Sequence, residues 1–247
     1  MIKLEYALAP IELSEDFIKQ NTEEYKKKST HVWGVNFIKE GVYNSSFGKC
    51  CYSESQLNVE GKYMEIDHFF PKIHFPHLIL EWTNLLPSNK KCNTTKGDLN
   101  PLEIKIINPY SDNPKEHLYV KNFRYYHLTP IGKNTIDYTA INDYSHFTKV
   151  RSEICLEIID ELDYLNDNLT EAISSKSLRK TTITINKIKN LLKNGFRTQT
   201  YAAVISTTIL ADVKFIEIRE ILTRNEKWDS ELNDIISELE YCALPSP

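Results

Sequence analysis

The chain has 247 residues, a formal net charge of −4 and a pI near 6.0, with 41% hydrophobic and 11% aromatic residues. This composition is typical of a globular protein with a sizeable core or two subdomains. No apolar run reaches the roughly 18 residues of a transmembrane helix, which argues against a membrane protein. The N-terminal residues lack the apolar core of a signal peptide, and the odd number of cysteines, 5, does not indicate a disulfide framework. We therefore expect a reducing cytoplasm as the compartment.

In chain order, the first predicted element is a polar helix over residues 11–28, with Ser14 as a cap near its start and acidic residues in its first turn. Trp33 and Phe37 follow as candidate core aromatics. Residues 62–97 are then predicted to form a β-hairpin that leads into a short helix.

Residues 108–114 are dense in turn formers, and strand-forming residues flank Asn122, which predicts strands at 117–120 and 125–128. From about residue 145 the pattern becomes helical. Apolar residues recur there at the spacing of one helix face: Val150, Ile154, Ile158, Leu162, Leu165, Leu169 and Ile173. Further helices are predicted over residues 177–194, 200–224 and 229–242.

Charge is unevenly distributed in the helical part of the chain. Residues 153–171 hold 7 acidic residues and no basic one, and residues 176–197 hold 7 basic residues and no acidic one. Five of the basic residues fall on one side of a helix: Lys176, Arg179, Lys180, Lys187 and Arg197. Two interpretations are open: the two segments form an antiparallel hairpin whose charges pair with each other, or they present charged faces to a partner.

The residues with the clearest chemistry lie between positions 65 and 98. Asp67-His68 follows a strand-like run, Asn84 comes next, and Cys92-Asn93 and Lys96-Gly97 complete the group. Each has an ordinary structural explanation by itself. His68 is then a hydrogen-bonded residue, Asn84 a turn former, and Lys96-Gly97 a helix end with its glycine cap. Their order and spacing together favour a single functional site.

The residue types suit the hydrolysis of a phosphodiester. An imidazole titrates near neutral pH, so neutral His68 can take a proton from water. Mg²⁺ prefers a few hard oxygen ligands, and Asp67 and Asn93 offer a carboxylate and an amide oxygen. Adjacent residues on a strand point to opposite faces, so Asp67 and His68 address one phosphate only if the strand end is irregular.

This group of residues resembles the HNH endonuclease motif. The resemblance implies an α+β fold with a ββα-metal unit, in which His68 and Asn84 are catalytic and Asp67 and Asn93 hold Mg²⁺ or Mn²⁺. In the family, the residue matching Asn84 hydrogen-bonds backbone and holds the loop that orients the histidine. Lys96, on the same helix face as Asn93, and Lys72 are expected to contact substrate phosphate.

Many HNH proteins also carry two Cys-x-x-Cys pairs that bind a structural zinc. Here one cysteine of each pair is replaced, which leaves Cys50 with Ser53 and Asn89 with Cys92. Structural zinc needs four Cys or His ligands, and Cys50 and Cys92 alone cannot complete such a site. Cys51 and the pair His74 and His77 are disfavoured as substitutes, so we expect the zinc to be absent.

Motifs after the hairpin extend the resemblance over roughly residues 30–155 to the HNH effector nucleases of retron and Septu antiphage systems (PtuB-like). They are Asn108-Pro109, the segment 112–118 and the segment 128–136. In that family a helical region docks on an ABC-like ATPase. We therefore expect a nuclease domain over residues 1–145 and a mostly α-helical partner-binding region over residues 146–247. For His117, a structural hydrogen bond is favoured over catalysis.

The sequence thus predicts a metal-dependent endonuclease, the effector of a prokaryotic antiviral complex with an ABC-like ATPase and, in a retron setting, a reverse transcriptase with its RNA–DNA hybrid. The negative net charge indicates that a partner supplies part of the nucleic-acid surface. Two alternatives stay open: an RNase acting on tRNA or structured RNA, and a non-catalytic binding subunit of HNH shape. The motif does not distinguish DNA from RNA.

Overall fold

The computed structural model describes residues 1–59 and 63–246, which fall into two compact units. The first unit comprises residues 1, 3–117 and 127–142, and the second comprises residue 2, residues 118–126 and the chain from residue 143 onward. The sequence placed residues 118–126 with the nuclease region, whereas the structure counts them in the second unit. Within the described residues, no helix combines the length and apolar character that crossing a membrane requires.

The first unit begins with two helices that pack on a small apolar core. Helix α1 (Glu15–Lys28) starts as predicted at Ser14, whose hydroxyl accepts a hydrogen bond from the Phe17 N–H at 3.2 Å. Helix α2 (Asn36–Asn44) follows. Trp33 and Phe37 both pack against the core. Its buried residues are Leu13, Val32, Ile38, Val42, Ile79, Leu80 and Leu85.

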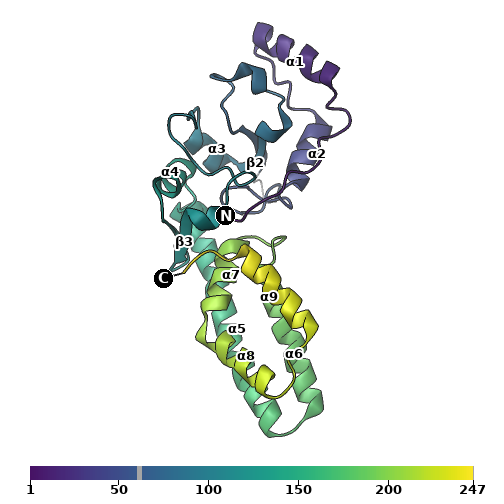
Figure 1. Cartoon of the computed structure of the whole chain (residues 1–247), viewed down its shortest axis with the longest axis vertical. Helices are drawn as coiled ribbons and strands as arrows, with labels where there is room; N and C mark the ends of the chain where they lie inside the picture. The colour runs from purple at the N-terminus through teal and green to yellow at the C-terminus, as the bar shows by residue number, and fades with distance from the viewer. Residues whose placement is uncertain (60–62, 247) are drawn as a thin grey trace. The chain divides into compact units, whose positions relative to one another are not determined.

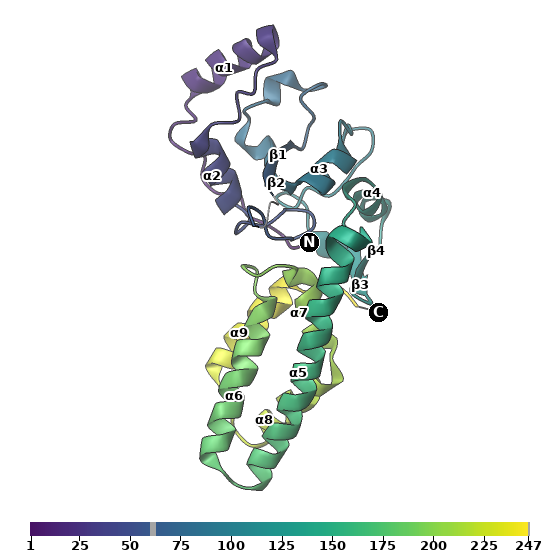
Figure 2. The same cartoon turned by 180° about the vertical axis from the view of Figure 1, so that it is seen from behind.

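The central element of this unit is a strand pair followed by a helix (Figure 2). Strand β1 (Met64–His68) runs antiparallel to β2 (Leu85–Asn89), and helix α3 (Lys90–Lys96) follows β2 directly. The side chain of Asn89 caps α3 by accepting from the Lys91 N–H at 2.8 Å, and Gly97 ends it with φ +53°. The predicted hairpin began at residue 62, which lies outside the described residues.

Two short 3-10 helices, Pro76–Leu78 and Trp82–Asn84, lie in the connection between β1 and β2. A third, Pro114–Glu116, precedes the predicted second hairpin, which is β3 (Leu118–Lys121) and β4 (Arg124–His127). Asn122 and Phe123 both have positive φ, as a two-residue turn between twisted strands requires. Helix α4 (Pro130–Thr139) was not anticipated, although Thr-Pro is a common helix start.

The second unit is mostly helical (Figure 1). A π-helical turn, Tyr144–Thr148, leads into α5 (Lys149–Ser174), and α6 (Leu178–Leu192) returns beside it. A 3-10 turn, Lys193–Gly195, then precedes α7 (Ala202–Ala211), α8 (Val213–Arg224) and α9 (Ser230–Cys242). Ile158, Leu162, Leu165 and Leu169 of the predicted stripe are buried, as its helical spacing requires.

The single helix predicted over residues 200–224 is wrong, because the chain is extended at Asp212 and α8 begins after it. The Asp212 carboxylate accepts from the N–H groups of Lys214 and Phe215 at 2.8 and 3.1 Å. An aspartate side chain readily caps a helix start by accepting hydrogen bonds from backbone N–H groups. The spacing of apolar residues does not reveal such a break between two helices.

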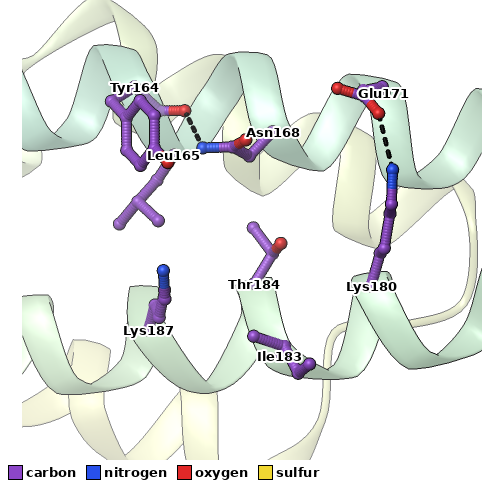
Figure 3. Close-up of a pocket in the computed structure, with 8 residues that line it drawn as sticks. All are labelled: Tyr164, Leu165, Asn168, Glu171, Lys180, Ile183, Thr184 and Lys187. Atoms are coloured by element: carbon purple, nitrogen blue, oxygen red, sulfur yellow. Dashed lines mark hydrogen bonds and ion pairs between the residues drawn. The ribbon is translucent and has the colours of Figure 1, made fainter.

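Among the described residues, three of the 7 basic residues in the segment 176–197 form ion pairs with α9, and one forms an ion pair with α5. Glu171 of α5 and Lys180 of α6 form an ion pair at 2.8 Å (Figure 3). Lys189 and Lys193 instead contact Glu231 at 2.7 and 3.0 Å, and Arg197 contacts Glu238 at 2.6 Å. Of the two open interpretations, the hairpin is present as α5 and α6, but the charge pairing between these two helices is limited to Glu171 and Lys180 within the described residues.

Candidate active site

His68 ends β1 and is buried, with 5% of its surface exposed. Its Nε2 lies 3.0 Å from the carbonyl oxygen of Ile79. A carbonyl oxygen only accepts hydrogen bonds, so Nε2 must carry the proton and donate it. The neutral ring then has its lone pair on Nδ1. Burial lowers the pKa of His68 to about 4, because the protonated ring is poorly solvated there. His68 is therefore neutral at pH 7 and has one unprotonated ring nitrogen.

Asn84 fixes the loop that leaves β1. Its Oδ1 accepts from the Phe70 N–H at 2.7 Å, and its Nδ2 donates to the carbonyl oxygens of Phe70 and Leu78, both at 3.1 Å. Its own carbonyl oxygen accepts from the Phe69 N–H at 3.0 Å. Asn84 is 2% exposed, so these bonds are shielded from water. The contacts are to backbone, which is the type of contact the family resemblance implies for this residue.

Asp67, the residue before His68, is also buried and has a partner on each oxygen. Lys96 donates to Oδ1 at 2.8 Å and the Tyr52 hydroxyl donates to Oδ2 at 2.7 Å. The Lys96 ammonium also donates to the His68 carbonyl oxygen at 2.8 Å. Sequence reasoning had placed Lys96 at a substrate phosphate. In the structure its charge is used inside the unit, because the adjacent carboxylate needs a counter-ion.

Asn93 and Glu65 form a second pair on the same face. The Asn93 Nδ2 donates to Glu65 Oε2 at 2.8 Å, and both side chains are half-buried. Within the described chain no hydrogen bond reaches the Asn93 Oδ1. Sequence analysis did not name Glu65. The signal was present, because residues two apart on a strand share a face and Glu65 stands two before Asp67.

Glu65, Asp67 and Asn93 are the chemically suitable donors for a hard divalent cation. Their carboxylate and amide oxygens are the ligands that Mg²⁺ prefers, and Mg²⁺ needs few of them because it keeps waters. The Asn93 Oδ1, which accepts no hydrogen bond within the described chain, could be one of these ligands. The three residues therefore offer the type of ligand atom that the cation prefers. Asp67 is available only if Lys96 gives up its contact. Among the described residues, no three or more His, Cys, Asp or Glu side chains are grouped to hold a metal ion.

Trp33 contacts His68, and Lys72 contacts Trp33. The Trp33 ring meets the His68 ring edge-on, with centroids 4.9 Å apart. The Lys72 ammonium lies 5.5 Å from the Trp33 ring centroid. Lys72 was predicted to contact substrate phosphate. Lys72 is half-buried, and the Trp33 ring contacts both it and His68. Lys72 is therefore more accessible to a substrate than Lys96, whose side chain is fully buried.

Three cysteines meet behind β2, and all are buried. Burial raises the pKa of Cys51 and of Cys92 well above the ordinary thiol value. Burial also acts to raise the pKa of Cys50, but hydrogen bonds from Cys51, Cys92 and Ser53 outweigh it and lower that pKa. His74 and His77 are exposed and contact the Phe75 ring. The expected absence of structural zinc stays a prediction.

The positions that replace the two missing cysteines have structural contacts of their own. Asn89 caps α3 through the Lys91 N–H. The Ser53 hydroxyl lies 3.0 Å from that of Ser55, and its N–H donates to the Cys50 sulfur at 3.5 Å. Hydrogen bonds thus connect these segments at the positions where the resemblance would place zinc ligands.

A comparison with curated proteins found two relatives of one kind. The Septu protein PtuB of Bacillus thuringiensis is 30% identical over 256 aligned residues, which cover 100% of this chain and 96% of that protein. The chain belongs to the Septu PtuB family. The Septu protein PtuB of Bacillus mycoides (strain KBAB4) is 29% identical over 49% of this chain and 55% of its own length. No family model and no solved structure matches the chain.

Membership in the Septu PtuB family confirms the resemblance inferred from the motifs and makes the chain a component of Septu-type antiphage defence. The alignment with the Bacillus thuringiensis protein covers the whole chain, whereas the motifs covered only its middle. The helical second unit is therefore part of what the two proteins share.

Proposed function

We propose that this chain is an HNH-type endonuclease and the nucleolytic effector of a Septu-type complex. In this proposal β1, β2 and α3 are the two strands and the helix of a ββα-metal unit. The observation that carries it is the hydrogen bond from His68 Nε2 to the Ile79 carbonyl oxygen. That bond fixes both the ring orientation and the tautomer, which are the two properties that a general base needs.

His68 is the proposed base. Its Nδ1 takes a proton from water as the water oxygen bonds to the phosphorus, the bond to the leaving oxygen breaks, and the leaving oxygen takes a proton from solvent water. The new positive charge on the ring is stabilised by the Ile79 carbonyl oxygen, which accepts from Nε2. Asn84 holds the loop that follows His68 through its bonds to Phe70, so the ring is presented from a rigid element.

Asp67 and Asn93, with Glu65 beside them, are the proposed holders of a divalent cation, Mg²⁺ or Mn²⁺. When bound, that cation supplies charge neutralisation at the phosphate. Lys72 is the proposed phosphate contact among the predicted lysines. Its half-buried ammonium lies over the same ring that touches His68. Lys96 is proposed instead as the internal counter-ion of Asp67.

We further propose that the chain works in a complex with an ABC-like ATPase, and in a retron setting with a reverse transcriptase and its RNA–DNA hybrid. The net charge of −4 supports a partner that adds basic surface for the polyanionic substrate. The α5–α6 face supports a docking role for the helical unit. Tyr164 and Ile183 are exposed there, and Lys187 lines the same hollow (Figure 3).

A second candidate function is a non-catalytic binding subunit. The observation that favours it is that both Asp67 oxygens already accept a hydrogen bond and that one donor is the Lys96 ammonium, whose positive charge competes with a metal ion. In a subunit that has lost catalysis, Asp67 would keep its bonds to Lys96 and Tyr52 and would not bind a metal ion. An RNase acting on tRNA or structured RNA would use the same residues as the endonuclease proposed first. Only the nucleic acid that is cleaved distinguishes these two enzymes.

The test is cleavage by the purified chain together with its ATPase partner. Plasmid DNA, single-stranded DNA and total tRNA are incubated with Mg²⁺ or with EDTA. We expect cleavage of one class in Mg²⁺ only, and we expect His68→Ala to lose roughly 10²–10⁴ in rate. His77→Ala, which changes an exposed histidine in the same connection, is the matched control. Wild-type rates in His68→Ala would contradict the assignment, and no cleavage under any condition would favour the binding subunit.

A further inference from the structure

A cavity of about 300 Å³ in the first unit is not used by the proposed chemistry. Phe69 and Phe70, the two residues that directly follow His68, form part of its wall. The remaining wall comes from the turn-rich segment after α3, from the residue before β3 and from the start of α4. The lining residues that matter for binding are Leu102, Lys105, Asn108, Ser111, Asp112 and His117.

The aromatic part of this cavity is held rigidly. Phe69 is 6% exposed, and the half-buried Phe70 ring makes edge-on contacts with Phe69 and Phe75, each at 5.3 Å between centroids. The Phe70 backbone is fixed on both its N–H and its carbonyl oxygen by Asn84. An aromatic surface that is already ordered loses little conformational freedom when a flat ligand stacks on it.

The polar part offers a donor and an acceptor. The Thr129 hydroxyl accepts from the Gly132 N–H at 3.2 Å and lies 2.9 Å from His117 Nδ1. Either atom can be the donor in the contact between Thr129 and Nδ1, and the other ring nitrogen, Nε2, is left to hydrogen-bond a ligand as donor or acceptor. Asp112 accepts from the Asn108 N–H at 2.8 Å and from Ser111 at 3.3 Å, and a carboxylate has further lone pairs.

We propose that this cavity binds one unpaired nucleobase of the substrate strand, an inference that rests on the proposed nucleolytic function. A flat heterocycle matches both parts, because its π-face suits Phe70 and its edge carries donors and acceptors for His117 and Asp112. A phosphate does not match, since Asp112 would repel it. Lys105 also lines the cavity and is exposed, so it is placed to contact a phosphate of the nucleic-acid backbone at the rim.

The inference narrows the substrate class. A base enters such a cavity only when it is out of its stack and out of its pair, which costs least in single strands and loops. The substrate is therefore single-stranded or looped nucleic acid, DNA or RNA. Because Phe69 and Phe70 follow His68 directly, the bound base sets which phosphate lies opposite His68.

The test measures binding by the full-length chain in EDTA, where metal-dependent cleavage is blocked. A short end-labelled oligonucleotide is compared with a series in which one position at a time is abasic, in a DNA and in an RNA version. The series keeps every phosphate and removes one base. Phe70→Leu retains an apolar side chain and loses the π-face. Phe75→Leu is the matched control, because Phe75 packs on Phe70 and does not line the cavity.

We expect one abasic position to weaken binding roughly 5- to 150-fold, the value of one stacked base. That penalty should vanish in Phe70→Leu and persist in Phe75→Leu. Leu102→Trp, which changes a side chain that is 67% exposed and fills the cavity from its rim, should also remove the penalty without risk to folding. The RNA and DNA series show which strand the cavity takes.

Two results overturn the inference, and they are distinguishable. In the first result, the intact oligonucleotide binds but no abasic position weakens binding, or the abasic penalty in Phe70→Leu and Leu102→Trp equals that of the wild-type chain. The cavity then does not hold a base, and the nuclease proposal stands. If the wild-type chain binds no oligonucleotide of either kind, alone and with its partner, the inference and the proposed nucleolytic function fail together.

Discussion

Lys96 in α3 places its ammonium 2.8 Å from the Asp67 carboxylate at the end of β1, and neither side chain is more than 3% exposed. The same ammonium donates to the His68 carbonyl oxygen. One lysine therefore connects the helix that carries Asn93 to the strand that carries Asp67 and His68. A buried ion pair of this kind holds two elements in register even where its net contribution to stability is small.

Lys96→Met should lower the stability of the metal-free chain by about 3–5 kcal/mol, because it leaves Asp67 buried without a counter-ion. The same change should tighten the binding of Mn²⁺, because the competing ammonium is gone. Chemical denaturation and titration calorimetry measure the two effects. Lys90→Met, an exposed position on the same helix, should change neither. Unchanged Mn²⁺ affinity in Lys96→Met would show that Lys96 does not compete with the cation.

The low pKa of His68 predicts a pH dependence of folding stability. The folded-state pKa is about 4 and lies below the ordinary histidine value near 6.5, so the unfolded chain binds the proton more readily. The stabilisation is complete above pH 6.5 and is lost as the pH falls toward 4, with a limit of about 3 kcal/mol. Denaturation of wild type and His68→Gln at pH 7 and pH 4.5 checks this. The free energy of unfolding lost between pH 7 and pH 4.5 should be smaller in His68→Gln than in wild type. Equal losses would contradict a lowered pKa for His68.

Asn84→Ala and Asn84→Asp should separate the two functions of this side chain. Alanine removes the acceptor for the Phe70 N–H, so hydrogen exchange at that amide should become faster. Aspartate keeps the acceptor but sets a carboxylate oxygen against the Phe70 and Leu78 carbonyl oxygens, so stability should fall while the Phe70 amide stays protected. Each lost bond is worth about 1 kcal/mol. Equal exchange rates in the two variants would rule out this division.

Asp67→Asn and Asn93→Ala should each raise the Mg²⁺ concentration needed for half-maximal cleavage by roughly tenfold or more. Asp98→Asn, two residues beyond the end of α3, removes the same charge outside the site and is the control. A wild-type midpoint in Asp67→Asn would mean that Asp67 is not a ligand and that Lys96 is its permanent partner.

Elemental analysis of the purified chain should find less than one zinc per molecule, because Ser53 and Asn89 stand at two of the four ligand positions. The double variant Ser53→Cys with Asn89→Cys should acquire one zinc, because it restores four thiols together with Cys50 and Cys92. Loss of the Asn89 cap offsets part of the gain by about 1 kcal/mol. One tightly held zinc in the wild-type chain would refute the first expectation.

Local features of the sequence predicted several elements well. Ser14 caps α1, Gly97 ends α3, and the turn at Asn122 joins β3 to β4, because each of these depends on residues only a few positions apart. The stripe from Ile158 to Leu169 is buried for the same reason, since its spacing alone defines one face of α5. The motifs after the first hairpin, Asn108-Pro109 and the segments 112–118 and 128–136, were likewise enough to indicate the Septu family.

What the sequence by itself determined was therefore the Septu PtuB family and most of the helices and strands. Only the tertiary structure decided what the individual residues touch. Lys96 turned inward because Asp67, 29 positions away in the chain, required a counter-ion when both were buried. Lys189 and Lys193 paired with Glu231 of α9 because the fold brings this carboxylate closer to them than the acids of α5. Partners of this kind are set by desolvation and distance in three dimensions, which no local pattern records.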